Sequence, residues 1–276
     1  MRHSMKNMTI TKHSFLRFVI CILAITFVTH TPVQAQKLQG KKQREYLQIK
    51  IYHATDSAHV AIIDQYLQAS LIPVLEKNGF RKTGVFKAID NDTARDKRVY
   101  VMIPFTALTQ LERLNAIAEK TILDSVTARA YTKAVFNKAP FTRIETVLLY
   151  SFEGAPQVVP SGLKGDKAAR VYELRSYESA TEALHLNKVQ MFNAGEVELF
   201  DRLGFNAVFY GQVIAGNRMP NLMYMTSFDD KASRDAHWKA FGGDPAWKTM
   251  SSKPEYQNNV SKIEIVFLRP VAYSRL

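Results

Sequence analysis

The feature that most constrains this chain is an internal repeat, because the same order of strand and helix patterns occurs twice. Residues 47–52 and 172–177 each alternate between apolar and polar side chains, as a half-buried strand does. Each is followed by an amphipathic helix pattern that stops at a Gly-Phe pair, where Gly79 or Gly204 suits the left-handed position after a helix. The two halves therefore predict two copies of one structural unit.

The remaining elements recur at matching places. Each half continues with a hairpin, a second helix that begins near Thr109 or at Asp229 or Asp230, and a last strand. The last strands, residues 143–149 and 262–268, have a basic residue, Ile, Glu and aliphatic residues in the same register. The order βαββαβ predicts an α+β fold made of two tandem ferredoxin-like domains. Pro73 lies inside the first helix pattern and predicts a bend there.

The domain boundaries follow from composition. We expect a signal peptide at residues 1–35, a flexible leader at 36–44 and a first domain at 45–152. Residues 153–169 are rich in Gly and Pro, which is typical of an exposed linker, and residues 170–276 form the second domain.

One face of each sheet is left uncovered by this topology, and an apolar face needs another layer to pack on. We predict that the two sheets pack together within the chain as a pseudo-dimer that forms a closed barrel, since a linker of this length lets them meet. The alternative is that each half pairs with its counterpart in a second chain. Further homodimerisation is compatible with either arrangement.

The N-terminal segment has the pattern of an export signal. Residues 1–17 contain four basic and no acidic side chains, and residues 18–28 are an apolar run too short to span a bilayer. Val33-Gln34-Ala35 offers a cleavage site, so we expect cleavage between Ala35 and Gln36 and a periplasmic or secreted protein. The alternative is an uncleaved N-terminal anchor.

The composition of the chain limits the kinds of partner that the protein is expected to bind. Removing residues 1–35 takes away four basic residues and no acidic ones, which lowers the net charge from +12 to +8. The remaining basic residues are scattered, so neither nucleic acid nor, after signal cleavage, a membrane is expected as a partner. The single cysteine, Cys21, would be lost with the signal, which excludes disulfides and thiolate metal sites.

The second half resembles the NIPSNAP family of the dimeric α/β-barrel superfamily. The resemblance begins at Tyr172-Glu173-Leu174-Arg175 and runs through the first helix and the hairpin to the second helix, and it is looser in the first half. Beyond the opening strand it rests on His185, Lys188, Met191, Phe192, Gly195, Glu196, Met219-Pro220-Asn221-Leu222, Tyr224-Met225, Phe228, Arg234, Trp238, Phe241, Asp244 and Trp247. It implies tandem ferredoxin-like domains and supplies no established reaction.

No motif predicts a metal, a cofactor or a nucleotide. The four histidines that follow the signal lack the i, i+4 spacing of a helical metal site, and there is no Gly-x-Gly-x-x-Gly, no phosphate loop and no Gly-x-Ser-x-Gly. We therefore expect no bound metal and no cofactor.

Aromatic and polar side chains cluster in the second half and predict a pocket between sheet and helices for a small organic ligand. The candidate residues are Arg175, Tyr177, His185, Arg218, Tyr224, His237, Trp238 and Trp247. Core packing explains such aromatic residues equally well. The main hypothesis is a small-molecule-binding or association module. The alternative is a cofactor-independent oxygenase or isomerase for an aromatic or lipid-like substrate, with His185 or His237 as base and Arg175 or Arg218 holding an anion.

Overall fold

The computed structural model describes residues 42–276, which form one compact unit. The predicted signal peptide, its cleavage site at Ala35 and Gln36, and the leader up to residue 41 lie outside the described residues. Within residues 42–276, none of the helices combines the length and the apolar character that crossing a membrane requires.

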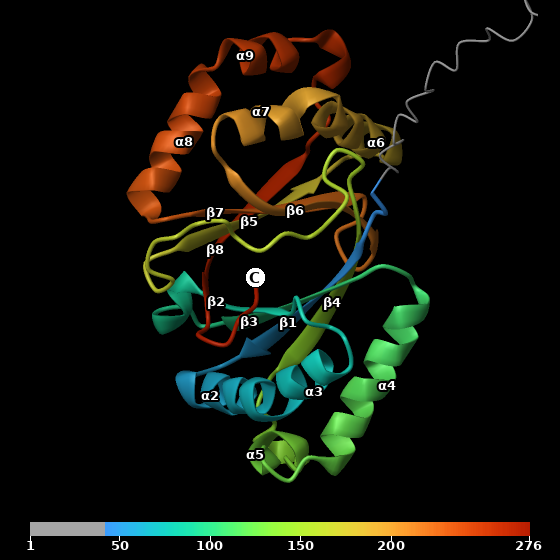
Figure 1. Cartoon of the computed structure of the whole chain (residues 1–276), viewed down its shortest axis with the longest axis vertical. Helices are drawn as coiled ribbons and strands as arrows, with labels where there is room; N and C mark the ends of the chain where they lie inside the picture. Colours follow the sequence, from blue (N-terminus) through green and yellow to red (C-terminus); the bar gives the residue numbers. More distant parts are fainter. Residues whose placement is uncertain (1–41) are drawn as a thin grey trace, which may run out of the picture. The chain divides into compact units, whose positions relative to one another are not determined.

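Each half consists of four strands with helices after its first and third strands (Figure 1). The first half contains β1 (Tyr46–Ala54), α2 (Ser57–Tyr66), η1 (Leu67–Leu71), α3 (Ile72–Lys77), β2 (Gly84–Ala88), η2 (Ile89–Asp92), β3 (Lys97–Phe105), α4 (Thr109–Asp124), α5 (Arg129–Thr132), η3 (Phe136–Lys138) and β4 (Arg143–Ser151). The second contains β5 (Val171–Glu178), α6 (Glu182–Met191), η4 (Phe192–Glu196), α7 (Val197–Arg202), β6 (Asn206–Ala215), β7 (Asn221–Phe228), α8 (Lys231–Gly243), α9 (Pro245–Ser251), η5 (Pro254–Tyr256) and β8 (Lys262–Pro270).

The eight strands of the described residues close into one antiparallel barrel in the order β1-β3-β2-β8-β5-β7-β6-β4. Each half keeps the ferredoxin-like order, with its second and fourth strands at the sheet edges. β2 pairs with β8, and β4 pairs with β6. The predicted intramolecular pseudo-dimer is therefore confirmed. The sheets also join at their edges by backbone pairing, over residues 86–88 with 268–270 and over residues 148–151 with 211–215.

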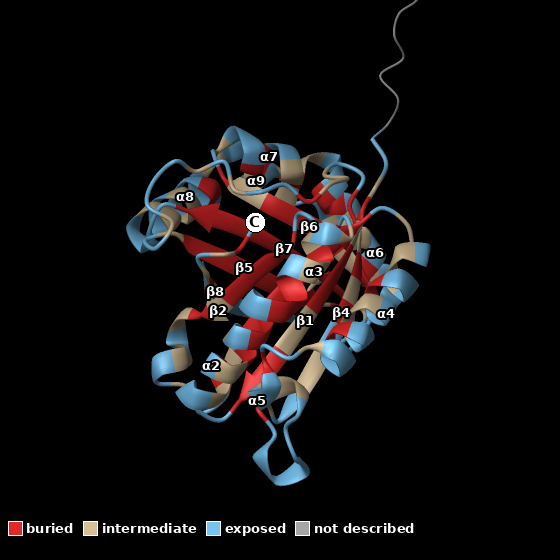
Figure 2. Cartoon of the chain, turned by 60° about the horizontal axis from the view of Figure 1, so that its bottom comes forward, coloured by how far each residue is buried: buried red, intermediate tan, exposed pale blue. Residues whose placement is uncertain are grey.

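Period-two alternation along the strands separates three apolar cores. On β1, Leu47 and Ile49 point into the barrel, whereas Tyr52 packs under the helices of the first half. The corresponding helix-facing core of the second half contains Tyr177 and Tyr224. Figure 2 shows the strands as largely buried and the outward helix faces as exposed. The structure is thus a barrel interior between two sheets, each covered by helices on its outside.

The first helix of each half is interrupted by a π-helical turn, η1 or η4. Pro73 is the second residue of α3 and lies in its first turn, just after η1, where the sequence predicts a bend. The second half has no proline there and instead uses Gly195, whose φ of 151° suits glycine. The interruption therefore belongs to the fold rather than to proline. Gly79 and Gly204 have φ of 96° and 76°, which confirms the predicted helix ends.

The segment predicted as an exposed linker is anchored to the barrel. Val158 is completely buried in the barrel core, and its N–H donates to the Glu45 carboxylate at 2.8 Å. The Val159 N–H donates to the Val208 carbonyl at 2.9 Å. This segment therefore holds the halves together in addition to the two strand joints.

Candidate functional site

Four of the eight predicted pocket residues meet on the helix-facing side of the second sheet. Arg175 and Tyr177 lie on β5, Tyr224 on β7 and Trp238 on α8. Arg175 Nη1 donates to the Tyr177 hydroxyl at 2.8 Å, and the two tyrosine hydroxyls are 2.8 Å apart. The Arg175 guanidinium stacks over the Trp238 ring, 3.7 Å from its centroid. These four predicted residues are therefore neighbours in space.

Glu173 is the centre of this cluster, although the pocket prediction omitted it. Its carboxylate is fully buried and accepts hydrogen bonds from Arg175 Nε, Arg234 Nη2 and Trp238 Nε1, each at 2.7 Å. Burial acts to raise the pKa of Glu173, but the bonds from Arg234 and Arg175 outweigh it and lower the pKa. Buried polar side chains that supply one another's hydrogen-bond partners are typical of the interior of a folded protein. A ligand-binding role for the four residues stays a prediction.

The other four predicted residues are dispersed. His185 lies on α6, and burial lowers its pKa despite the opposing effect of Glu182. His237 Nδ1–H on α8 donates to the Ser233 carbonyl at 2.7 Å. Trp247 on α9 packs 4.4 Å from the Phe241 ring. The fourth, Arg218, lines a cavity at the barrel mouth, and the lining of that cavity does not include His185, His237 or Trp247. The proposed bases are therefore not placed beside Arg218.

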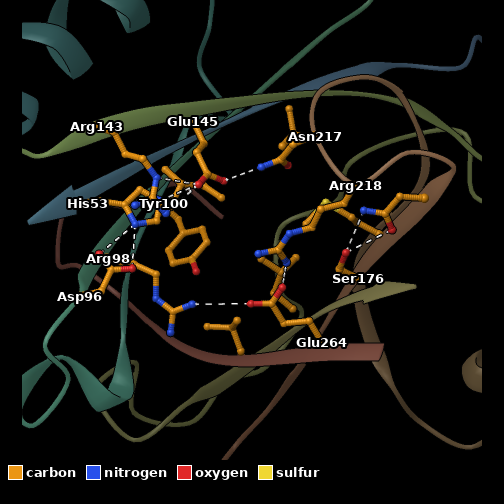
Figure 3. Close-up of a pocket in the computed structure, with 16 residues that line it drawn as sticks. His53, Asp96, Arg98, Tyr100, Arg143, Glu145, Ser176, Asn217, Arg218 and Glu264 are labelled. Atoms are coloured by element: carbon orange, nitrogen blue, oxygen red, sulfur yellow. Dashed lines mark hydrogen bonds and ion pairs between the residues drawn. The ribbon is translucent and has the colours of Figure 1, made fainter. Parts of the chain in front are cut away.

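The cavity at the barrel mouth is the best-formed candidate site (Figure 3). It measures about 200 Å³ and is lined by both halves of the chain. Inward-facing positions two residues apart supply most of the lining, because alternate side chains of a strand point to the same face. The polar lining residues are His53, Asp96, Arg98, Tyr100, Arg143, Glu145, Ser176, Asn217, Arg218, Asn221 and Glu264.

Two glutamates occupy equivalent positions in the two halves. Glu145 on β4 pairs with Ile51 of β1, and Glu264 on β8 pairs with Ser176, the β5 residue that matches Ile51 in the repeat. Each glutamate contacts a residue of the other half. Asn217 Nδ2 donates to Glu145 at 3.2 Å, and Arg98 Nη1 lies 3.9 Å from Glu264. The site therefore exists only when the barrel is closed.

His53 lies between two carboxylates. Its Nδ1–H donates to both Asp96 oxygens at 2.9 Å, and its Nε2 lies 3.3 Å from Glu145 Oε1. The Nε2 atom is buried and has no hydrogen-bond partner within residues 42–276. Burial acts to raise the pKa of Glu145, but hydrogen bonds from Arg143 and Asn217, with His53 nearby, lower it. The arrangement presents an oriented imidazole beside an ionised carboxylate.

On the other side of the mouth, Glu264 is in an ion pair with Arg218. Arg218 has a φ of 63°, a conformation that costs a non-glycine residue on the order of 1–3 kcal/mol and is often found at functional sites. Arg98 has only long ion contacts, 3.6 Å to Asp90 and 3.9 Å to Glu264, and its buried Nε has no hydrogen-bond partner in the described part of the chain. Its charge is therefore the least neutralised of the three mouth arginines.

Tyr100 lies in the middle of the view in Figure 3, between the Glu145 and Glu264 groups. Burial raises the pKa of Tyr100 to about 12, although Arg98 acts in the opposite direction. The phenol therefore remains protonated near neutral pH and can donate a hydrogen bond into the cavity.

No cluster of three or more His, Cys, Asp or Glu side chains in residues 42–276 is arranged to hold a metal ion. Asp96 and Glu145 illustrate why, since they face opposite ring nitrogens of His53 and do not converge on one point.

Of the residues that line the mouth, Arg218 alone was among those predicted from the sequence. The available signal was the repeated pair of basic residue and glutamate, Arg143-x-Glu145 and Lys262-x-Glu264, at the start of both last strands. Charged residues at i and i+2 on a strand share one face, and at the end of a barrel strand that face opens to solvent.

Comparison with known proteins supports the architecture. The NIPSNAP profile matches residues 172–275. A candidate monooxygenase from Fusobacterium nucleatum is 7% identical, with a TM-score of 0.55 over 82% of this chain and 92% of that chain. A candidate monooxygenase from Lactobacillus acidophilus is 13% identical, with a TM-score of 0.51 and coverage of 82% and 94%. An anthrone oxidase-like protein is 11% identical, with a TM-score of 0.51 and coverage of 86% and 97%.

These identities show a shared fold alone. None of the curated proteins matches the sequence. The NIPSNAP family profile covers the second half of the chain, and the first half repeats the same fold to close the barrel.

Proposed function

We propose that the barrel mouth binds a small organic acid and that the protein acts as a small-molecule-binding module. The observation that carries this is the cavity itself, which has two buried polar atoms without hydrogen-bond partners in residues 42–276, His53 Nε2 and Arg98 Nε. Buried polar groups are normally paired, so unpaired ones that line a cavity favour a missing ligand or water.

The charges of the lining favour an anionic group. Arg143 and Arg218 each have a close carboxylate partner, whereas the nearest carboxylates to Arg98 are 3.6 and 3.9 Å away. A ligand carboxylate beside Arg98 could accept hydrogen bonds from its guanidinium and from the Tyr100 hydroxyl. The apolar lining from Ile51, Leu174 and Val266 would contact the organic part of the ligand.

The cavity volume limits the ligand. Pockets for drug-sized ligands measure roughly 300–1,000 Å³, and this one measures about 200 Å³. The proposal therefore specifies a ligand of about one ring or a short chain rather than a lipid or a nucleotide.

Isothermal titration and thermal shift with benzoate and its neutral isostere benzamide, together with short aliphatic acids, would test the proposal. We expect acids to bind and neutral isosteres not to bind. Arg98→Gln should weaken binding about tenfold or more, since a hydrogen bond to a charged group contributes about 1.5–3 kcal/mol. The matched control is Arg202→Gln, because Arg202 forms an exposed ion pair with Asp244 away from the mouth. Binding that is absent for all acids, or that survives Arg98→Gln unchanged, would refute the proposal.

A second candidate function is a cofactor-independent oxygenase or isomerase, and the His53–Asp96 pair favours it. A histidine oriented by a carboxylate through Nδ1, with Nε2 toward a cavity, has the arrangement of a general base. His53 takes the role that the sequence suggested for His185 or His237. The names of the similar structures make anthrone a sensible probe. Oxygen consumption that is lost in His53→Gln but kept in His59→Gln would support this function, and no turnover by the parent protein would argue against it.

We also propose that the protein is exported and cleaved before Gln36, on the sequence pattern of residues 1–35. N-terminal sequencing of the protein recovered from its host would test this, and a sequence that begins at Met1 would refute it.

A further inference from the structure

The three most exposed large apolar side chains of the described residues, and a fourth that is more than half exposed, lie in one stretch of the first half, between the last turn of α4 and η3. Phe136 is 96% exposed, Val126 75% and Leu123 70%, and Val135 is 55% exposed. The intervening helix α5 lies at the end of the barrel unit opposite α9 (Figure 1). Exposed apolar residues are ordinary when scattered, but a group of them marks a surface that another layer covers. We call these four residues the tip patch.

The tip patch is attached to an ordered base. The Lys133 ammonium donates to the Leu123 carbonyl at 3.1 Å, so the two ends of the stretch lie side by side. Tyr131 of α5 stacks on Tyr66 of α2 with ring centroids 4.0 Å apart and ring planes almost parallel. The helix α5, which precedes Phe136 in the chain, is therefore packed against α2.

Most of the exposed charges around the tip patch are basic. The one acidic side chain within the stretch, Asp124, is exposed and forms an ion pair with Lys120 at 2.7 Å. Between Asp124 and Glu145 the chain contains four basic and no acidic residues. Arg129, Lys133 and Lys138 are exposed, whereas Arg143 is paired with Glu145 at the barrel mouth. Apolar side chains flanked by cations are typical of surfaces that enter the interface of an anionic bilayer. A second copy of the chain fits less well, because a two-fold contact at this patch would bring like charges together.

We propose that the tip patch docks the protein on an anionic lipid bilayer. Phe136 and its apolar neighbours enter the headgroup region, and Arg129, Lys133 and Lys138 contact the lipid phosphates. The proposal differs from the expectation, drawn from the sequence, that the protein has no membrane partner once its signal is cleaved. The proposal is independent of ligand binding at the barrel mouth, because the two surfaces share no residue.

Vesicle flotation with residues 42–276 would test the proposal, since these residues form one compact unit with a barrel closed within itself. The vesicles contain phosphatidylcholine alone or mixed with phosphatidylglycerol. We expect binding to the anionic vesicles that weakens with salt. Phe136→Ser should reduce the partition coefficient about tenfold, and Lys133→Gln with Lys138→Gln should reduce it by about fivefold for each charge removed.

Leu186→Ser is the matched control, because Leu186 is a similarly exposed apolar residue on α6 in the other half. Its partition coefficient should equal that of the parent. Thermal unfolding confirms that each variant is folded, which is expected because the changed side chains are on the surface. No binding to anionic vesicles, equal binding to neutral ones, or an equal loss in Leu186→Ser would overturn the proposal. So would a parent dimer that Phe136→Ser converts to a monomer, because a second copy would then cover the patch.

Discussion

Lys188→Met is expected to destabilise the protein by a large fraction of its folding free energy. Lys188 Nζ lies 2.7 Å from Glu196 Oε2, and the two side chains are only 5% and 3% exposed. Removing one partner of a buried ion pair costs about 3–5 kcal/mol, because the other charge is left without compensation. Domains are typically stable by only about 5–15 kcal/mol. Urea denaturation at neutral pH would therefore show a much lower midpoint for Lys188→Met.

The pH dependence of this loss has a definite sign. Burial raises the pKa of Glu196 above its ordinary 4.5, even though Lys188 acts to lower it. A group whose pKa is higher in the folded than in the unfolded protein stabilises the fold at pH values below its unfolded-state pKa. This stabilisation is lost as the pH rises through the pKa that the group has in the folded protein. Without Lys188 the pKa of Glu196 rises further, so the deficit of Lys188→Met should shrink as the pH falls from about 7.5 to about 5.

A double variant separates the lost charge pair from lost packing. Lys188→Met combined with Glu196→Met replaces the pair by apolar side chains and should recover most of the stability, since such replacements are often neutral. If the single and the double variant are equally unstable, or if the deficit of the single variant does not change with pH, the reasoning is wrong.

Three further predictions concern single positions. Gly195→Ala should lower the melting temperature, because Gly195 has φ of +151° and an added Cβ would lie 2.8 Å from a methionine methyl carbon. The control Gly242→Ala should not lower it, because open space surrounds Gly242, and equal melting temperatures of the two variants would contradict the prediction. Asp230→Ala should lower the free energy of unfolding by about 1 kcal/mol in urea denaturation, because its side chain caps α8; an unchanged midpoint would argue against it. His185→Gln should reduce the loss of stability that the protein shows between about pH 7 and 5. The pKa of His185 is lowered in the folded protein, so the neutral imidazole contributes stability above the ordinary pKa of 6.5, and this contribution is lost as the pH falls; an unaltered pH profile would exclude this.

Much of the local structure could be predicted from the sequence. Gly79 and Gly204 mark the two helix ends because few other residues take a left-handed conformation there. Asp230 and Asp244 begin helices because their side chains satisfy backbone N–H groups of the first turn. Both are consequences of neighbours in the chain, which a sequence pattern records directly.

The sequence by itself determined the repeat, the order of strands within each half, and the alternation of side chains along each strand. That alternation places Glu145 and Val147 on the same face. It did not determine which face of each strand turns to the helices and which to the barrel interior, because the alternating pattern is the same for either choice. Only the edge pairing of β2 with β8 and of β4 with β6 decides it. Closure brings Glu145 and Glu264 to one mouth although they lie far apart in the chain, since long-range pairing depends on both halves at once.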